Sequence, residues 1–210
     1  MKILVTAGAT REAIDPVRFL SNRSTGKMGY AVAGVAVERG HEVRLVSGPV
    51  AMDEPSGVSV VRVVSAADML DAVLADFGWC DVLVMCAAVA DWRPRVVAEQ
   101  KMKKFDAGDG MTLELERTVD ILQAVGDVKQ SQVVVGFAAE TENMLSEARR
   151  KLVAKGLDMI VANDVSRADA GFEVDTNAVT FVTANGEVVL PLMSKCAVAD
   201  RLIRAVEALT

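Results

Sequence analysis

Apolar and polar residues follow one another along the chain in blocks that predict strands separated by helices. Apolar runs or alternation predict six strands, at residues 2–6, 41–46, 58–64, 81–86, 133–137 and 157–162. Helical spacing predicts three helices between them, at residues 26–39, 66–77 and 141–155. Ser65 has the place of an N-cap, and Gly40 and Gly156 have the place of helix-ending glycines. Strands that alternate with helices indicate a parallel sheet with right-handed crossovers.

The end of the chain has a different pattern. Two apolar runs, 178–182 and 188–192, flank Asn185-Gly186, and Asn-Gly between such runs predicts a β-hairpin. A final helix is expected over residues 194–208. No internal repeat or linker-like stretch interrupts the chain. We therefore expect one α/β domain over residues 1–210, with a mostly parallel sheet flanked by helices and a C-terminal hairpin.

Residues 91–110 do not fit the alternation of strands and helices. The segment is polar, contains Pro94 and ends in Gly-Asp-Gly, so we expect a mobile flap. Ligands of open parallel sheets bind beyond the carboxyl ends of the strands. Four predicted strands, those that end near Thr6, Cys86, Phe137 and Ala162, are followed by small residues and then polar ones. This pattern predicts a ligand crevice at that edge.

Composition narrows the classes of ligand. The 210 residues are 51% hydrophobic and 25% charged, and the net charge is −6, which is typical of a soluble globular protein and provides no basic field for nucleic acid or an acidic membrane. An anionic ligand must therefore meet local lysines and arginines. The three cysteines form no CxxC pair and predict reduced thiols in a cytoplasmic protein. The single histidine, His41, allows no histidine metal site, and we expect neither a signal peptide nor a membrane span.

Three common nucleotide signatures are missing. The dinucleotide fingerprint needs glycines where Thr10 and Ala13 stand. A Tyr-x-x-x-Lys pair for hydride-transfer chemistry fails because Tyr30 is the only tyrosine and Gly34 follows at the lysine position. A P-loop fails because residues 26–28 read Gly-Lys-Met.

Three groups of cations are candidates for binding phosphate. Residues 18–29 place amide, hydroxyl and cationic donors against a predicted helix start, which favours an anion, although a well-capped helix with solvated charges has the same composition. Lys101-Met-Lys-Lys104 is either a basic flap that closes over phosphates or a solvated patch. Lys151 and Lys155 lie one helical turn apart and either reach one polyphosphate or face solvent.

The motifs are more specific than these physical arguments. In order and spacing the chain resembles phosphopantothenate–cysteine ligases through the strings TAGATREAIDPVRFLSNRSTGKMGYA, LVSGPV, AAVADWRP, KMKK, VVGFAAETEN and ANDVS. The likeness runs from residue 2 to the final helix. In many bacteria such a ligase is the C-terminal half of a fusion with a flavin-dependent decarboxylase. This chain begins at Met1, so we expect a stand-alone ligase, with a separate decarboxylase chain as a possible partner.

The resemblance implies a Rossmann-like homodimer that joins 4′-phosphopantothenate to L-cysteine on the route to coenzyme A. The carboxylate attacks the α-phosphate of CTP, which is accompanied by Mg2+, and pyrophosphate leaves. The cysteine amine then displaces CMP from the acyl-cytidylate. The C-terminal hairpin is the contact surface that we expect for the dimer.

The resemblance also implies the site residues. Asn22 matches a catalytic asparagine, and Lys101 matches a flap lysine that contacts the nucleotide phosphates. The other nucleotide positions are Met85, Cys86, Ala87, Asp91, Thr118, Val119, Asp120, Ile121, Phe137, Lys151 and Lys155. The positions for phosphopantothenate are Arg18, Asn22 and Ala88. No metal ligands are implied.

Departures from the family pattern are few. Ala9 and Ala13 replace a glycine and a proline, and both are small. Residues 118–121 read Thr-Val-Asp-Ile where the family has Asn-Pro-Asp-Ile. The chain therefore lacks one asparagine that the family pattern implies for recognition of the base, which weakens the expectation of CTP over ATP. Two other classes stay open on the residues alone. One is an NAD(P)-dependent oxidoreductase, which the missing fingerprints disfavour, and the other is a non-catalytic nucleotide-binding module, which the retained Asn22 and flap lysines disfavour.

Overall fold

A computed structural model describes residues 1–103, 110–140, 143–164, 171 and 173–210. The strands of its main sheet are β1 (Lys2–Ala7), β4 (Glu42–Ser47), β5 (Ser59–Arg62), β6 (Val82–Met85), β9 (Val133–Glu140), β10 (Met159–Asp164), β12 (Val179–Thr183) and β13 (Gly186–Val189). The helices are α1 (Lys27–Glu38), α2 (Ala66–Phe77), α3 (Ile121–Val128), α4 (Met144–Ala154) and α5 (Lys195–Glu207).

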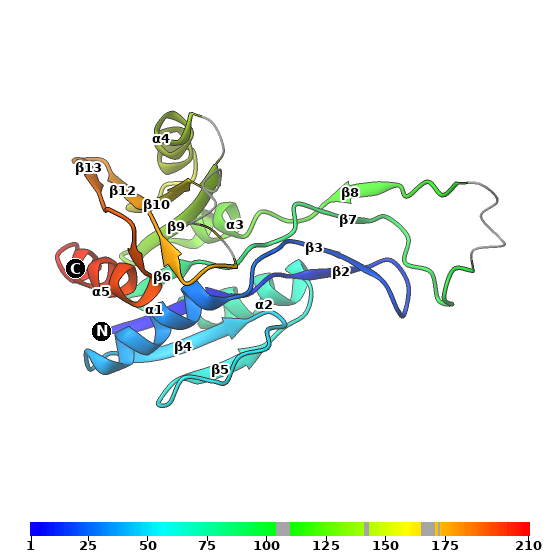
Figure 1. The fold of residues 1–210 in the computed structure, drawn as a ribbon, viewed down its shortest axis with the longest axis horizontal. Coiled ribbons are helices and arrows are strands. Elements are labelled where there is room, and N and C mark those ends of the chain that lie inside the picture. Colours follow the sequence, from blue (N-terminus) through cyan, green and yellow to red (C-terminus); the bar gives the residue numbers. More distant parts are fainter. Residues whose placement is uncertain (104–109, 141–142, 165–170, 172) are drawn as a thin grey trace.

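The eight strands lie in the order β13-β12-β10-β9-β6-β1-β4-β5 (Figure 1). The six strands β5, β4, β1, β6, β9 and β10 are parallel to one another, β12 is antiparallel to β10, and β13 is antiparallel to β12. The chain builds outward from β1 in one direction through β4 and β5, and in the other through β6, β9 and β10. This is the doubly wound, Rossmann-like order, and its switch point lies between β1 and β6. The expected fold class is confirmed.

Helices cover both faces of the sheet. In β1 the side chains of Ile3 and Val5 pack toward α1 and α5, and Leu4 packs toward α2, α3 and α4. This alternation places two apolar layers around a central sheet that is buried on both sides. The apolar runs of the central strands therefore belong to the part of the sheet that is covered on both faces, whereas the edge strands β5 and β13 are largely exposed.

Helix ends follow the expected signals. Ser65 caps α2 in a capping box with Asp68, and Gly40 and Gly156 adopt the left-handed conformation after α1 and α4, with φ of 84° and 59°. The sequence reading missed α3. Its signal is Asp120, whose side chain accepts a hydrogen bond from the Gln123 amide at 3.1 Å.

The C-terminal hairpin is confirmed, and it extends the main sheet. Strand β12 pairs with β10 and then with β13 through a turn at residues 184–185. The hairpin is therefore the antiparallel edge of the same sheet, with Val188 and Val189 exposed on the last strand. A small separate ribbon, β11 (Thr176–Asn177) with β14 (Met193–Ser194), lies before α5.

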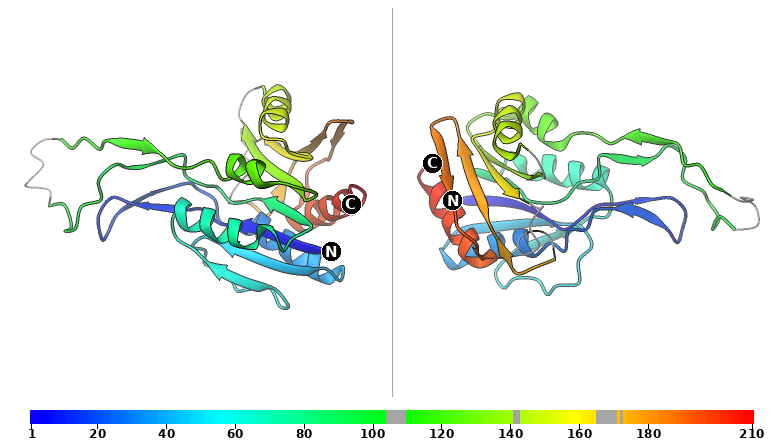
Figure 2. Two further views of the ribbon diagram at one scale, coloured as in Figure 1. Left: turned by 180° about the vertical axis from the view of Figure 1, so that it is seen from behind. Right: turned by 45° about the horizontal axis from the view of Figure 1, so that its top comes forward.

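An arm projects from the sheet (Figures 1 and 2). It consists of two antiparallel ribbons, β2 (Arg11–Ala13) with β3 (Phe19–Ser21) and β7 (Trp92–Pro94) with β8 (Leu115–Arg117). We call the described parts of residues 11–21 and 91–117 the arm. The segment 91–110 was expected to be an irregular flap, but it begins with β7. Residues 104–109, including Lys104, lie outside the described residues.

Among the described residues, no helix has the length and apolar composition to cross a membrane.

Gly29 lets α1 approach β1 closely. A Cβ atom on Gly29 would lie 2.6 Å from Ala7 Cβ and 2.8 Å from the Thr6 carbonyl oxygen. We predict that Gly29→Ala destabilises the protein by about 1–3 kcal/mol through overpacking, measured as a lower melting temperature. Gly34→Ala is the matched control on the same helix, because no atom lies within 4 Å of its added Cβ. Equal melting temperatures for the two variants would contradict the close contact.

Candidate functional site

Two adjoining pockets open at the switch point. The α3 pocket, of about 660 Å³, is lined by Met85, Ala87, Val89, Asp91, Trp92, Arg117, Thr118, Val119, Asp120, Ile121, Leu122, Gly136, Phe137, Lys151, Lys155, Leu157 and Ile160. The α1 pocket, of about 420 Å³, is lined by Asn22, Ser24, Thr25, Gly26, Lys27, Met28, Cys86, Ala87, Ala88, Val89, Asp91, Phe137, Ala138, Ala139, Lys151, Asn163, Gly171, Asn177 and Lys195. Five residues line both pockets, so a single ligand can extend from one into the other.

The loop after β6 forms the wall between the pockets. Its backbone is tied to the chain that leaves β1. The Ala88 amide donates to the Gly8 carbonyl at 2.9 Å, and the Ala90 amide donates to Thr10 Oγ1 at 2.9 Å. These bonds hold residues 86–90 as a rigid wall in place of a free loop.

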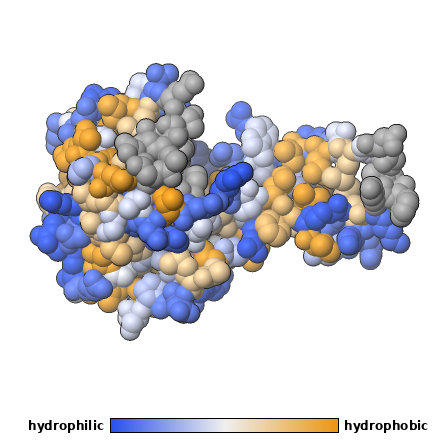
Figure 3. All heavy atoms as spheres, viewed as in Figure 1, coloured by the Kyte–Doolittle hydropathy of each residue, from blue (hydrophilic) through white to orange (hydrophobic). Residues whose placement is uncertain are grey.

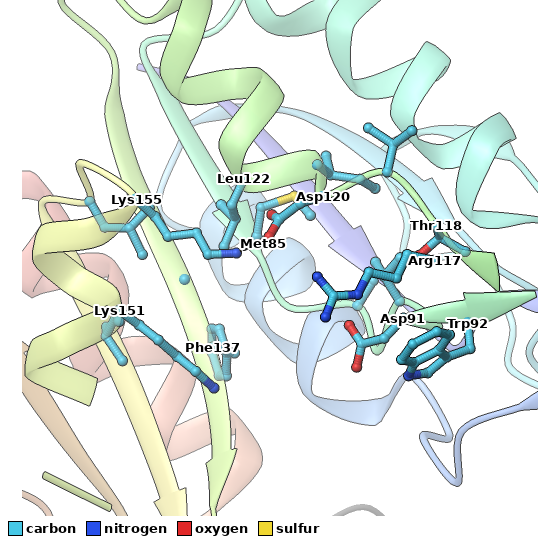
Figure 4. A pocket seen from close by; sticks show the side chains of 17 residues that line it. Met85, Asp91, Trp92, Arg117, Thr118, Asp120, Leu122, Phe137, Lys151 and Lys155 are labelled. Carbon is cyan, nitrogen blue, oxygen red and sulfur yellow. Dashed lines mark hydrogen bonds and ion pairs between the residues drawn. The ribbon is translucent and has the colours of Figure 1, made fainter. Parts of the chain in front are cut away.

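The α3 pocket combines an apolar floor with charged walls (Figure 4). Lys151 and Lys155 reach in from α4, and Asp120 faces them from the start of α3. Lys155 forms an ion pair with Asp120. Burial tends to raise the pKa of Asp120, but the hydrogen bond from Lys155 outweighs it, and the pKa lies below its usual value. A phosphate in this pocket must therefore compete with a carboxylate for Lys155.

The sequence reading missed two residues on the arm side of the α3 pocket. Trp92 and Arg117 face each other across the β7–β8 ladder, with the guanidinium carbon 5.7 Å from the indole centroid. Figure 4 shows them beside Asp91. Trp92 belonged to the string AAVADWRP, but Arg117 had no signal because its role depends on the unpredicted ribbon.

The α1 pocket contains the N-terminus of a helix. Gly26 is the N-cap of α1, with φ of 83° and no side-chain capping hydrogen bond. A well-capped helix with solvated charges was the alternative reading of residues 18–29, but residue 26 provides no side-chain cap and Lys27 is paired with Asp175. The amides of this first turn, next to Lys27, are suited to an anion.

Asn22 lies at the wall between the pockets. Its Nδ2 donates to the Ala88 and Val89 carbonyl oxygens, at 3.2 Å each. Asn22 therefore holds the loop of residues 86–90, which we call the wall loop, and does not cap α1. The structure brings Asn22 and Ala88 together, as the family resemblance implied.

Asn163, near the end of β10, belongs to one of the polar stretches that predicted the crevice, but the sequence reading gave it no role. It is 8% exposed, and its Oδ1 has no hydrogen-bond partner in the part of the chain that the structure describes. Buried acceptors are rarely left without a donor. Since Asn163 lines the α1 pocket, a ligand with an N–H or O–H group would satisfy it.

Arg18 and Lys101 do not line either pocket. Arg18 is on the arm, where its Nε donates to Asp15 at 2.9 Å and its Nη2 donates to the Met102 carbonyl at 2.8 Å. The Arg18 hydrogen bond holds the pKa of Asp15 far below its usual value. The expected grouping of Arg18 with Asn22 and Ala88 is therefore absent within one described protomer.

Burial makes the Cys86 thiol a poor nucleophile. Burial raises the pKa of its thiol to about 12, although the nearby charge of Lys195 opposes this, so the thiol is protonated at neutral pH. Nor do three or more His, Cys, Asp or Glu residues gather as a metal site within the described residues.

The fold and the pockets define a class: a doubly wound α/β protein with a cation-lined ligand crevice at its switch point. The chain belongs to the family described as DNA/pantothenate metabolism flavoprotein C-terminal domain, whose model matches residues 1–209.

Known relatives agree with this assignment. The coenzyme A biosynthesis bifunctional protein CoaBC of Bacillus subtilis is 52% identical over 99% of this chain and 51% of its own length. A crystal structure of the C-terminal domain of a CoaBC protein is 46% identical, with a TM-score of 0.84 over 99% of this chain and 94% of that one. A DNA/pantothenate metabolism flavoprotein structure from Streptococcus pneumoniae is 25% identical, with a TM-score of 0.86 and full coverage of both chains. The chain thus spans about half the length of the curated relatives it matches.

The unpartnered acceptor of Asn163 can be tested without a ligand. Asn163→Leu removes a buried oxygen that has no donor, so we predict a smaller loss of stability than for Asn177→Leu. Asn177 is 2% exposed, and its Oδ1 accepts from the Gly171 amide at 3.1 Å. Losing that satisfied bond costs about 1–3 kcal/mol. Urea unfolding compares the two, and an equal or larger loss for Asn163→Leu would show that Oδ1 is satisfied within the protein.

Proposed function

We propose that this protein joins 4′-phosphopantothenate to L-cysteine in coenzyme A biosynthesis, through an acyl-cytidylate made from CTP. The observation that supports this most is the pair of pockets that meet at residues 87–91. One pocket has lysines and an apolar floor suited to a nucleotide, and the other has Asn22 and a helix N-terminus whose N-cap residue, Gly26, provides no side-chain cap. Family membership and the CoaBC relatives, which are coenzyme A biosynthesis proteins, favour the same function.

In the first step a carboxylate oxygen of phosphopantothenate attacks the α-phosphorus of CTP. The new O–P bond forms as the bond to the β-phosphate breaks, and pyrophosphate leaves with that electron pair. Lys151 and Lys155 neutralise the phosphates, and Lys155 leaves Asp120 to do so. In the second step the cysteine amine attacks the acyl carbon, loses a proton to solvent, and displaces CMP.

Mg2+ fits this site. The α3 pocket presents two carboxylates, Asp91 and Asp120, and Mg2+ commonly takes one or two carboxylates together with substrate phosphates. The ion would neutralise phosphate charge. Release of Asp120 from Lys155 would make its oxygens available at the same moment.

A preference for CTP would not come from a hydrogen bond donated by the Thr118 side chain. Thr118 Oγ1 donates to the Ala90 carbonyl at 2.5 Å and so holds the wall loop. The lost family asparagine is therefore replaced by a structural contact, and base selection falls to backbone groups and to other residues of the α3 pocket. An oxidoreductase is disfavoured because the crevice lacks the glycine fingerprint, and a non-catalytic module is disfavoured by the retained Asn22.

We further propose a homodimer, and the arm is a better contact surface than the expected hairpin. The arm exposes large apolar side chains: Val17, Phe19, Trp92, Val96, Val97, Met111 and Leu115. Figure 3 shows apolar atoms gathered along it. A second copy on this surface would bury them and would bring Arg18 and Lys101 of one chain toward the pockets of the other.

Asn22 tests the chemistry. We predict that the wild type releases pyrophosphate when phosphopantothenate and CTP are present together. In the reaction Asn22 Nδ2 turns from the Ala88 and Val89 carbonyl oxygens to the developing oxyanion, so Asn22→Asp lowers kcat by about 10²–10³, the loss for one such donor. The added carboxylate repels the substrate carboxylate, so this variant is at least as impaired as Asn22→Ala. A raised KM with normal kcat would mean that Asn22 only shapes the wall loop. Repeating the assay with ATP tests the nucleotide choice.

Mixing two inactive chains tests the dimer. If the arm of one chain completes the site of the other, Asn22→Asp and Lys101→Ala chains refolded together should recover about a quarter of wild-type activity, because half of the dimers are mixed and each has one intact site. Lys103→Ala, a lysine change in the same arm segment, is the control for Lys101→Ala. No recovery, or a monomer by light scattering, would contradict the shared site.

A further inference from the structure

Lys195 is a buried cation that the proposed chemistry does not use. It begins α5, closes one side of the α1 pocket and is 5% exposed. It is the one lysine or arginine among the buried polar residues of the described chain. Burial of an ammonium group is unfavourable, and so is a cation in the first turn of a helix. The stability of α5 therefore gives no reason for a lysine at this position.

The three N–H groups of Lys195 all donate to backbone carbonyls of a single turn. Nζ donates to the carbonyl oxygens of Gly171 at 2.9 Å and Thr176 at 3.4 Å, and also to that of Val174. We call the described residues of 171–177 the clamp turn. Since lysine has three donors, none is left for a ligand. Lys195 can act on the site only through the clamp turn and through its charge.

The clamp turn in turn holds Lys27 at the α1 pocket. Lys27 Nζ donates to the Glu173 carbonyl at 3.1 Å and to Asp175 Oδ1 at 2.6 Å. Lys27 is also the first residue of α1, beside the helix N-terminus that lacks a side-chain cap. Two lysines from two helices are thus joined by the same short turn.

Among the described residues, the cations that line the α1 pocket, Lys27, Lys151 and Lys195, outnumber its one lining carboxylate, Asp91. Lys27 on α1, Asp175 in the turn and Cys86 at the end of β6 are the titratable groups that act on Lys195. Burial and the repulsion from Lys27 lower the pKa of Lys195. The side chain of Asp175 is 86% exposed and that of Lys27 is 34% exposed. The acid therefore lies toward solvent while the two cations line the pocket, which suits an anionic group.

We propose that Lys195 is a positioning residue, which locks the clamp turn so that Lys27 is held where it binds a phosphate group in the α1 pocket. The proposed function supplies two sources of that phosphate, the 4′-phosphate of phosphopantothenate and the α-phosphate of the nucleotide. Both present the same oxygens to Lys27 and to the helix N-terminus.

A double-mutant cycle tests this role by calorimetric titration of CMP and of 4′-phosphopantothenate, separately, into the full chain. Lys27→Met and Lys195→Met should each weaken one of the two ligands about tenfold, the loss of one charge-assisted contact. The double variant should bind no more than about twofold weaker than Lys27→Met, because Lys195 acts through Lys27. The ligand that weakens identifies the source of the phosphate.

Lys129→Met is the matched control. Lys129 is also a partly buried lysine that clamps a turn, with Nζ 2.9 Å from the Gly156 carbonyl and 2.6 Å from Asp158 Oδ2, but it lines neither pocket. It should lose stability while binding both ligands as the wild type does. If Lys195→Met does not fold, Lys195→Gln, which keeps two donors for the turn, replaces it in the cycle.

Unchanged affinity of the Lys195 variant for both ligands, or losses that add to those of Lys27→Met, would overturn the positioning role. Pyrophosphate release by the wild type separates this outcome from failure of the proposed function. If the affinity losses of the variants are non-additive but the wild type makes no product, the ligase function is excluded and the role of Lys195 stands. Additive losses in an active enzyme would remove only the role of Lys195.

Discussion

The site depends on the hydrogen bonds that join the end of β6 to the end of β1. Thr6 Oγ1 is fully buried and accepts from the Ala87 amide at 3.1 Å, and Thr10 Oγ1 does the same for Ala90. Beyond the paired residues of β1 and β6, only the bridge between Ala9 and Ala88 continues the backbone pairing, so these hydroxyls provide the remaining hydrogen bonds for the loop amides. Without them the wall loop would be free, and the two pockets would merge. The small residues of this loop leave room for a ligand, while the threonines provide the rigidity.

The same frame explains how an acidic protein can bind anions. Its cations are already paired: Lys155 with Asp120, Lys27 with Asp175, and Arg18 with Asp15. Each partner holds its cation in a defined place before a ligand arrives, which lowers the entropy lost on binding. The ligand must then replace a carboxylate, and phosphate, with more charge and more oxygens, does so better than a monoanion. Pairing therefore provides both preorganisation and selectivity.

Local signals in the sequence were sufficient for most of the fold. Both-sided burial made the strands continuous apolar runs, and the cap at Ser65 and the glycines after α1 and α4 marked helix ends. The short α3 was missed because eight residues carry little periodicity. The strings around Asn22 and after β6 located the crevice, and the predicted lysines of α4 do line it. Asn163 was part of a polar stretch that predicted the crevice, but it was given no role. Arg117 and Lys195 were not predicted, because each depends on contacts between segments that are far apart in the sequence.

The strands of the arm could not be predicted from the sequence of a single chain. They have three residues each, too few for an apolar pattern, and only Glu12 and Pro94 of these strands are buried, because the arm has no apolar core of its own. Two-stranded ribbons of this length are marginal in water. This arm is anchored at its root by bonds such as Thr118 to Ala90, while its exposed apolar side chains remain uncovered. A segment that a single chain cannot bury is stabilised by whatever covers it. If the cover is a second copy, the residues that appear misplaced in one protomer, Arg18 and Lys101, are placed by the assembly and not by the fold.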